Sequence, residues 1–197
     1  MIRIGLTGSI GMGKTTVARM FQRLGIPVFD ADAEVRRLQA EDAELIARIG
    51  EQFPGSVING KLDRDELARQ VLGQPFELRA LEAIVHPAVQ EARSGFVASN
   101  PHAPAILFDI PLLFETGGET AFDKVIVVSA PADVQRDRVL SRPGMTQQKL
   151  QAILARQLPD AEKRARADFV IDTGADLSTT ERQVRDILAC LGIAARG

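Results

Sequence analysis

The 197-residue sequence contains no tryptophan or tyrosine, only two histidines and a single cysteine. Without tryptophan or tyrosine, the chain lacks the usual aromatic platform for stacking single-stranded nucleic acid. The lone Cys190 excludes an internal disulfide and favours a reducing compartment, and no apolar run reaches the roughly 18 residues of a membrane span. Neither histidine has neighbours at metal-ligand spacing, which argues against zinc. We expect Cys190 to be a small core residue on the apolar face of the last helix.

Charge is nearly balanced over the whole chain but not along it. The net charge of −2 argues against a general nucleic-acid binder. Residues 136–166 nevertheless carry eight basic side chains against three acidic ones. In an otherwise acidic protein, such a block is typical either of a clamp on a polyanionic ligand or of a solvated helix face.

A glycine-rich segment near the N-terminus matches a phosphate-binding loop. Residues 8–15 read Gly-Ser-Ile-Gly-Met-Gly-Lys-Thr, a full G-x-x-x-x-G-K-[ST] motif. An apolar run precedes the motif and a helical spacing of apolar residues follows it, so the context favours the motif over a chance glycine turn. Such loops bind phosphate through inward-facing backbone N–H groups and the helix N-terminus. The candidate nucleotide-binding residues are Gly8, Gly11, Met12, Gly13, Lys14, Thr15 and Thr16. Lys14 is expected to reach the β- and γ-phosphates, and Thr15 to bind Mg²⁺.

Uninterrupted apolar runs separated by amphipathic stretches predict an α/β fold with parallel strands covered on both faces. The predicted strands are 2–7, 26–29, 105–108, 124–129 and 169–172. The predicted helices are 14–24, 33–49, 62–72, a run around 78–96 broken at Pro87, 132–140, 147–156 and 177–191. In its apolar helical context, His86 is expected to be buried with one hydrogen bond.

Three carboxylates follow predicted strands, at the edge where open α/β sheets bind their ligands. Asp109 ends the third strand and fits a carboxylate that holds Thr15 or a Mg²⁺-bound water. Asp32 fits the group that orients an attacking hydroxyl and accepts its proton. Asp30 either joins the site or only caps the following helix.

A small-molecule kinase needs a phosphate loop, a metal-linked carboxylate, an acceptor-orienting carboxylate and a cationic lid. All four can be nominated, with Arg138, Arg142 and Arg156 expected to close over the transferring phosphoryl group. A guanine-binding switch is disfavoured because the two asparagines, Asn59 and Asn100, do not form an Asn-Lys-x-Asp motif. A nucleoside-monophosphate kinase or another small-molecule kinase, and a nucleotide-dependent switch without turnover, remain the alternatives.

From Ile2 to about Leu191 the sequence resembles the dephospho-CoA kinase family. Asp-Ile-Pro-Leu-Leu-Phe-Glu at 109–115 is the most specific stretch of the resemblance. The other matching stretches are residues 4–8 leading into the loop, Asp30-Ala31-Asp32 with Arg36, Asp63-Arg64 with Leu67, His86-Pro87, 122–125 and 167–172. Met12 and Thr15 stand where the family often has serine; Thr15 keeps the hydroxyl, and Met12 is expected to contribute its backbone N–H.

The resemblance implies a single P-loop kinase domain with a five-stranded parallel sheet. Its core would comprise residues 1–30, 101–135 and 167–197, with a helical acceptor-binding region at 31–100 and a lid region at 136–166. The implied activity is phosphorylation of the ribose 3′-hydroxyl of dephospho-CoA by ATP with Mg²⁺, the last step of coenzyme A synthesis. The residues implied to contact the acceptor are Asp30, Asp32, Arg36, Arg64, His86 and Leu112. We expect a cytoplasmic monomer or weak homo-oligomer with no nucleic-acid or membrane partner.

Overall fold

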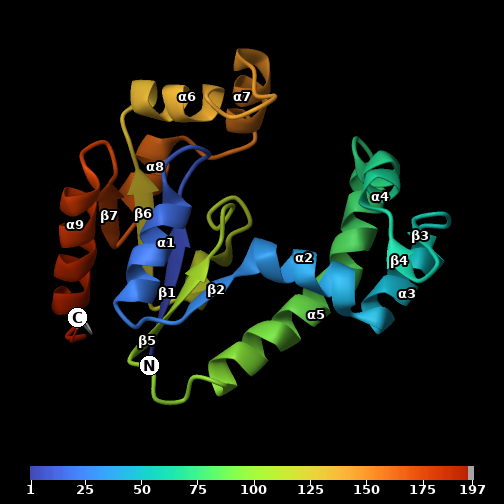
Figure 1. Ribbon diagram of the computed structural model, residues 1–197, viewed down its shortest axis with the longest axis horizontal. Helices are drawn as coiled ribbons and strands as arrows, with labels where there is room; N and C mark the ends of the chain where they lie inside the picture. Colours follow the sequence, from blue (N-terminus) through green and yellow to red (C-terminus); the bar gives the residue numbers. More distant parts are fainter. Residues whose placement is uncertain (195–197) are drawn as a thin grey trace. The chain divides into compact units, whose positions relative to one another are not determined.

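The computed structural model describes residues 1–194, which form two compact units (Figure 1). The first unit contains residues 1–29 and the chain from residue 102 onward, and the second contains residues 30–101. Each unit has a hydrophobic core of its own. No helix within residues 1–194 is both long and apolar enough to cross a membrane.

The first unit is built on a five-stranded parallel sheet with the strand order β2-β5-β1-β6-β7. The strands are β1 (Ile2–Thr7), β2 (Val28–Asp30), β5 (Ala105–Asp109), β6 (Lys124–Ser129) and β7 (Phe169–Asp172). The predicted α/β class and all five predicted strands are confirmed, although the second strand begins at Val28 rather than Ile26. Because β1 lies between β5 and β6, its carboxyl end is the switch point at which doubly wound sheets bind ligands.

Helices α1 (Lys14–Arg23) and α9 (Leu177–Cys190) pack against each other and cover one face of this sheet (Figure 1). Alternate residues of β6 point to opposite faces, as they do in any strand. Ile126 and Val128 therefore join the core formed with these two helices, whereas Val125 and Val127 face the other side. There they pack against Leu113 and the neighbouring Phe114.

The remaining helices of the first unit follow β6. They are α6 (Ala132–Leu140), α7 (Gln147–Leu154) and α8 (Asp160–Arg166), and a short 3-10 helix, η1 (Gly118–Ala121), precedes β6. Helices α6 and α7 begin at the predicted residues. The sequence reading did not include α8, a helix of 7 residues that packs against β6.

The second unit is helical. It contains α2 (Ala31–Glu41), α3 (Ala43–Gln52), α4 (Arg64–Val71), α5 (Pro75–Ala98) and a small antiparallel hairpin of β3 (Val57–Ile58) and β4 (Lys61–Leu62). The long α5 contacts α2, α3 and α4 (Figure 1). Their apolar faces share one core, made of Leu38, Leu45, Ile49, Phe53, Leu67, Val71 and Val85.

The single helix predicted over 33–49 is two helices, because Asp42 ends one and begins the next. Its backbone is extended, its N–H donates to the Leu38 carbonyl, and its side chain accepts a hydrogen bond from Leu45 N–H at 2.9 Å. This is the geometry of an N-cap, which fixes where α3 starts.

The break predicted at Pro87 is wrong, because α5 continues through it. Proline removes one backbone donor from a helix, but Pro87 is exposed, so water can satisfy the carbonyl that loses its partner. The neighbouring His86 is exposed as well, which corrects the prediction that it is buried.

The predicted inward face of the last helix needs two corrections. Cys190 is exposed, and Leu177 is 67% exposed. The buried stripe of α9 includes Val184, Ile187 and Leu188, which recur at helical spacing. Cys190 falls two residues beyond Leu188, about 200° around the helix, and so points away from the core.

Lys163 of α8 forms a buried ion pair on the second face of the sheet. Its side chain is 0% exposed, and its Nζ lies 2.7 Å from Glu115 Oε1. The same oxygen accepts a hydrogen bond from Leu158 N–H at 2.8 Å. Burial opposes the ionisation of Glu115, but Lys163 and Leu158 offset it and hold the pKa of Glu115 below its usual value. Lys163 therefore does not belong to the solvent-facing basic block expected at 136–166.

We predict that Lys163→Met lowers the free energy of unfolding at pH 7 by about 3–5 kcal/mol, because it leaves the Glu115 carboxylate buried without its counter-charge. The double variant Lys163→Met/Glu115→Gln should recover much of this loss, since Gln can still accept from Leu158 N–H. Urea unfolding of the two variants measures the difference. Equal losses in both would show that the ion pair does not matter.

A pH series tests the same pair. Because the pKa of Glu115 is lowered from 4.5 in the fold, its ionisation stabilises the protein above about that pH, and the contribution is lost as the pH falls through the folded-state pKa. The unfolding free energy of Glu115→Gln should therefore depend less on pH than that of the parent chain below about pH 4.5.

Candidate active site

The phosphate loop connects the end of β1 at Thr7 to the start of α1 at Lys14. Two of its glycines are required for clear reasons. Gly11 has φ +80°, and a Cβ atom there would lie 2.5 Å from Val139 Cγ2 of α6. At Gly8 a Cβ would lie 2.6 Å from the Val128 carbonyl oxygen. The loop is thus packed closely between β6 and α6, at the switch point of the sheet.

Met12 anchors the loop with both its side chain and its main chain. The side chain is buried, and its sulfur accepts a hydrogen bond from Ala130 N–H at 3.1 Å. The Met12 carbonyl oxygen accepts from Thr173 Oγ1 at 2.7 Å. The Met12 N–H, which was expected to contribute to phosphate binding, donates to the Ser9 carbonyl oxygen at 3.2 Å inside the loop.

Lys14 and Asp109 form an ion pair next to the loop. Lys14 opens α1 and Asp109 closes β5, the strand beside β1, so the sheet order brings them together. Their side chains are 17% and 5% exposed, which means that both charges are largely removed from water. Thr15 and Thr16, in the first turn of α1, are exposed.

A cavity of about 270 Å³ opens beside the loop. It is lined by Gly11, Gly13, Thr16, Arg138, Arg142, Thr173, Leu177 and Thr180. Arg138 donates to Thr173 Oγ1 at 2.9 Å and to the Thr173 carbonyl oxygen at 2.6 Å. Two of the three predicted phosphate-binding arginines are therefore at the cavity, whereas Arg156 is exposed beyond the end of α7 and is not among the described lining residues.

Sequence reasoning missed Thr173, Leu177 and Thr180. Thr173 had a signal, because it is a polar residue directly after the fifth strand, at the ligand-binding edge of the sheet. Leu177 was expected to face the core. Its exposure at the cavity instead offers an apolar surface to a ligand.

The predicted acceptor-side residues lie mostly in the second unit. Asp30 ends β2 and caps α2, accepting from Ala33 N–H at 2.8 Å. Asp32 and Arg36 are exposed one helical turn apart on α2, so they share a face of that helix. Arg64 Nη2 donates to the Arg36 carbonyl oxygen at 2.7 Å, which brings these two arginines together.

The other acceptor candidates are separate from this group. His86 is exposed on α5. Leu112 belongs to the first unit, where it is 42% exposed in the segment after β5. The next two residues of that segment, Leu113 and Phe114, are core residues, and Glu115 pairs with Lys163. Most of the 109–115 stretch therefore serves to cover the second face of the sheet.

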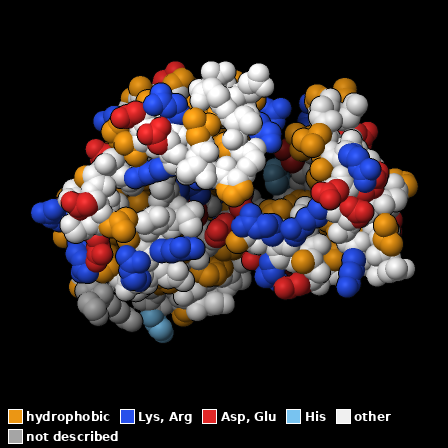
Figure 2. Space-filling model, turned by 45° about the horizontal axis from the view of Figure 1, so that its top comes forward, with side chains coloured by type: hydrophobic (Ala, Val, Ile, Leu, Met, Phe, Trp, Pro, Cys, Tyr) orange, Lys and Arg blue, Asp and Glu red, His pale blue; other side chains and the backbone are white. Residues whose placement is uncertain are grey.

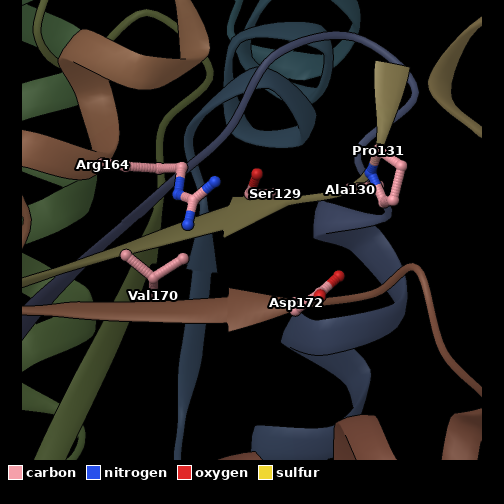
Figure 3. Close-up of a pocket in the computed structure, with 6 residues that line it drawn as sticks. All are labelled: Ser129, Ala130, Pro131, Arg164, Val170 and Asp172. Atoms are coloured by element: carbon pink, nitrogen blue, oxygen red, sulfur yellow. The ribbon is translucent and has the colours of Figure 1, made fainter. Parts of the chain in front are cut away.

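A second cavity, of about 150 Å³, lies at the carboxyl ends of β6 and β7 (Figure 3). It is lined by Ser129, Ala130, Pro131, Arg164, Val170 and Asp172. In Figure 3 the Arg164 guanidinium extends toward Ser129 and Val170, while the Asp172 carboxylate points toward Ala130. Asp172 Oδ1 already accepts from Gly174 N–H at 2.7 Å. None of the six lining residues belongs to the phosphate loop.

The basic block at 136–166 is only partly available to a ligand. Lys163 is buried, Arg138 is held by Thr173, and Arg166 forms an ion pair with Glu119. On the face drawn in Figure 2, basic and acidic side chains are interspersed. The arginines that line the cavity are therefore more informative than the charge of the block as a whole.

Comparison with known proteins identifies the family. A family model described as Dephospho-CoA kinase matches residues 2–179. The dephospho-CoA kinase of Brucella melitensis is 54% identical over 193 residues, which cover 97% of this chain and 96% of that protein.

Two solved structures have the same fold. The crystal structure of TT1252 from Thermus thermophilus is 39% identical, with a TM-score of 0.85 and coverage of 96% of this chain and 97% of that one. The dephospho-CoA kinase from Campylobacter jejuni is 22% identical, with a TM-score of 0.64 and coverage of 99% and 98%. The chain therefore belongs to the dephospho-CoA kinase family, and it is a kinase that uses ATP to convert dephospho-CoA into coenzyme A.

Proposed function

We propose that the chain transfers the γ-phosphoryl group of ATP to the ribose 3′-hydroxyl of dephospho-CoA, and that different residues bind ATP, bind the acceptor and stabilise the transferring group. One observation carries the proposal. The phosphate loop opens on a cavity lined by Arg138 and Arg142, and the Lys14–Asp109 ion pair lies beside the same loop. A polyanion is thus met by backbone N–H groups and by cationic side chains from two different helices.

ATP occupies the loop and the 270 Å³ cavity in this proposal. The triphosphate binds the loop, and the base and ribose lie toward Leu177 and Thr180 of α9. Lys14 exchanges Asp109 for the β- and γ-phosphates when the nucleotide enters. Until then Asp109 keeps the partly buried ammonium paired, which avoids leaving a desolvated charge without a counter-charge.

Thr15 and Asp109 would hold Mg²⁺. A hydroxyl and a carboxylate are hard oxygen donors, and Mg²⁺ in kinases takes one or two such protein ligands together with substrate phosphates. The metal supplies neutralisation of charge on the β- and γ-phosphates. The Asp109 carboxylate would bind the metal or its bound water once Lys14 has moved toward the phosphates.

The second unit would present the acceptor. We assign to Asp32 the orientation of the 3′-hydroxyl and acceptance of its proton, a role supported by its exposed position two residues after β2. A loose phosphoryl-transfer transition state asks little of the strength of the base, so position matters more than basicity. Arg36 and Arg64 are suited to the acceptor's phosphates, with His86 and Leu112 as further contacts.

The lid region at 136–166 completes the site. Arg138 and Arg142 would offset the charge of the transferring phosphoryl group, with Arg156 joining them on closure, and the closed lid would exclude water that otherwise hydrolyses ATP.

We place this reaction in the cytoplasm, supported by the single cysteine, and in a monomer or weak homo-oligomer.

The direct test is an acceptor panel with purified protein, ATP and Mg²⁺. Dephospho-CoA should give rapid ADP release, while AMP and shikimate should not. Equal rates with AMP would favour a nucleoside-monophosphate kinase. ATP binding without any acceptor-dependent ADP release would favour a switch.

Replacing Asp32 by Asn should keep ATP affinity, because the phosphate loop is untouched, but lower kcat by about 10²–10⁴-fold through loss of the general base. Asp186→Asn, on the exposed surface of α9, is a matched control that should behave like the parent chain. Steady-state kinetics and equilibrium ATP binding measure the two effects. Undiminished turnover of Asp32→Asn would move the role to Asp30.

Two variants of Thr15 distinguish a role in metal binding from a role in packing. Thr15→Ser keeps the hydroxyl and should keep activity, whereas the nearly isosteric Thr15→Val should raise the Mg²⁺ concentration needed for half-maximal rate by about tenfold or more, as expected for a lost metal ligand. Magnesium titrations at saturating ATP give this value. A Thr15→Val variant with an unchanged titration would remove Thr15 from the metal site.

A further inference from the structure

Two glutamine side chains bind the main chain of one phosphate-loop residue, Ile10. Gln157 Oε1 accepts a hydrogen bond from Ile10 N–H at 3.1 Å. Gln135 Nε2 donates one to the Ile10 carbonyl oxygen at 2.8 Å. The loop is therefore held at both the N–H and the carbonyl group of Ile10, the residue that precedes Gly11. Neither glutamine belongs to a motif recognised in the sequence.

These glutamines mark the two ends of one chain segment. Gln135 lies in α6, and Gln157 follows α7. We call residues 135–157 the arginine segment, because it contains all three candidate phosphate-binding arginines: Arg138, Arg142 and Arg156. Both ends of the arginine segment thus contact Ile10, although they are 22 positions apart in the sequence.

Each end is also fixed to the core. Beyond Gln157, the Leu158 N–H donates to Glu115, which pairs with the buried Lys163. Near the other end, Arg138 is held by Thr173, whose hydroxyl also binds the Met12 carbonyl oxygen. The two glutamines that bind Ile10 therefore belong to backbone segments that are themselves held in place. A shift of the Ile10 backbone is transmitted to these segments and is not absorbed by mobile side chains.

The chemistry of the amide side chain suits this place. A carboxylate within hydrogen-bond distance of the loop would repel a bound triphosphate, and an ammonium or guanidinium would compete with Lys14 for it. A neutral amide can hold backbone groups without changing the charge of the site. Gln135 is buried and Gln157 half-buried, which shields these bonds from competition by water.

We propose that Gln135 and Gln157 are positioning residues that couple the phosphate loop to the arginine segment through Ile10. The coupling rests on the proposed function, since it assumes that the loop binds the phosphates of ATP. Filling the loop shifts Ile10 and, through the two amides, orders the arginine segment. The arginines are then ordered for phosphate binding only after nucleotide has filled the loop, and the ordered segment excludes water from the γ-phosphate.

Gln157→Met tests the proposal because it removes the amide but keeps the length of the side chain. Gln151→Met is the matched control, since Gln151 is exposed on α7. Amide hydrogen exchange of the full chain is followed over residues 8–13 and 136–157, with and without ATP and Mg²⁺, in the absence of acceptor. In the parent chain and in the control, ATP should slow exchange in both segments.

In Gln157→Met, ATP should still slow exchange over 8–13, but the protection that it confers on 136–157 should fall about tenfold, the effect expected from one lost hydrogen bond. Without ligand, the melting temperature of Gln157→Met should fall by only about 2–4 °C relative to Gln151→Met, the cost of one lost hydrogen bond. Full ATP-induced protection of 136–157 in Gln157→Met would overturn the coupling. Faster exchange in both segments without ligand, together with the same ATP-induced protection as in Gln151→Met, would also overturn it in favour of a purely structural role.

Kinetics provide a second readout. The ratio of ATP hydrolysed by water to phosphoryl group transferred should rise about tenfold in Gln157→Met, with the KM for dephospho-CoA unchanged, whereas a general loss of structure would leave that ratio constant. Gln135→Met should behave alike, and the double variant should show less than the product of the two single effects, because both act on one residue. Effects that multiply would show that the two glutamines act independently.

These results distinguish the coupling from the reaction itself. If the parent chain releases no ADP in response to dephospho-CoA, the proposed function fails. The exchange experiment, which contains no acceptor, still decides whether ATP binding at the loop orders the arginine segment.

Discussion

A phosphate-binding loop has to keep its backbone in one defined path while leaving N–H groups for the ligand. In this chain most of the supporting contacts are made to carbonyl oxygens and side chains of the turn, and one is made to the Ile10 N–H. Thr173 binds the Met12 carbonyl oxygen, the Met12 side chain is buried against the end of β6, and the two glutamines bind Ile10. These partners come from α6, from the residues directly after β6 and β7, and from the segment after α7, so several elements of the first unit together support this turn.

Two lysine–carboxylate pairs show how the same chemistry serves different purposes. Lys163 is completely buried against Glu115 and joins α8 to the segment after β5. Lys14 keeps some exposure in its pair with Asp109, at the start of a helix whose N-terminus attracts anions. A pair with a completely buried lysine is costly to separate, whereas a partly solvated lysine can exchange one anionic partner for another. The Lys163–Glu115 pair therefore suits a permanent structural contact. The Lys14–Asp109 pair suits a contact that a bound ligand can replace.

The sequence was sufficient to predict the strands and the phosphate loop, because buried parallel strands and glycine-rich loops have strong local patterns. It failed where a contact distant in sequence or a single side chain decides the outcome. Asp42 divides a helix by its capping geometry, and Pro87 is tolerated because it faces water. Thr173 and the glutamines have no motif of their own. Their importance depends on hydrogen bonds to loop residues more than 120 positions away, which local periodicity cannot reveal.

The exposed thiol at the end of α9 has a practical consequence. Cys190 is the only cysteine of the chain and is exposed. A maleimide dye would therefore attach at one defined position without any substitution. Since the chain has no tryptophan or tyrosine, the fluorescence of the dye would be measured with almost no background from intrinsic near-ultraviolet fluorescence. The sequence without any substitution is thus suited to single-probe spectroscopy of nucleotide binding.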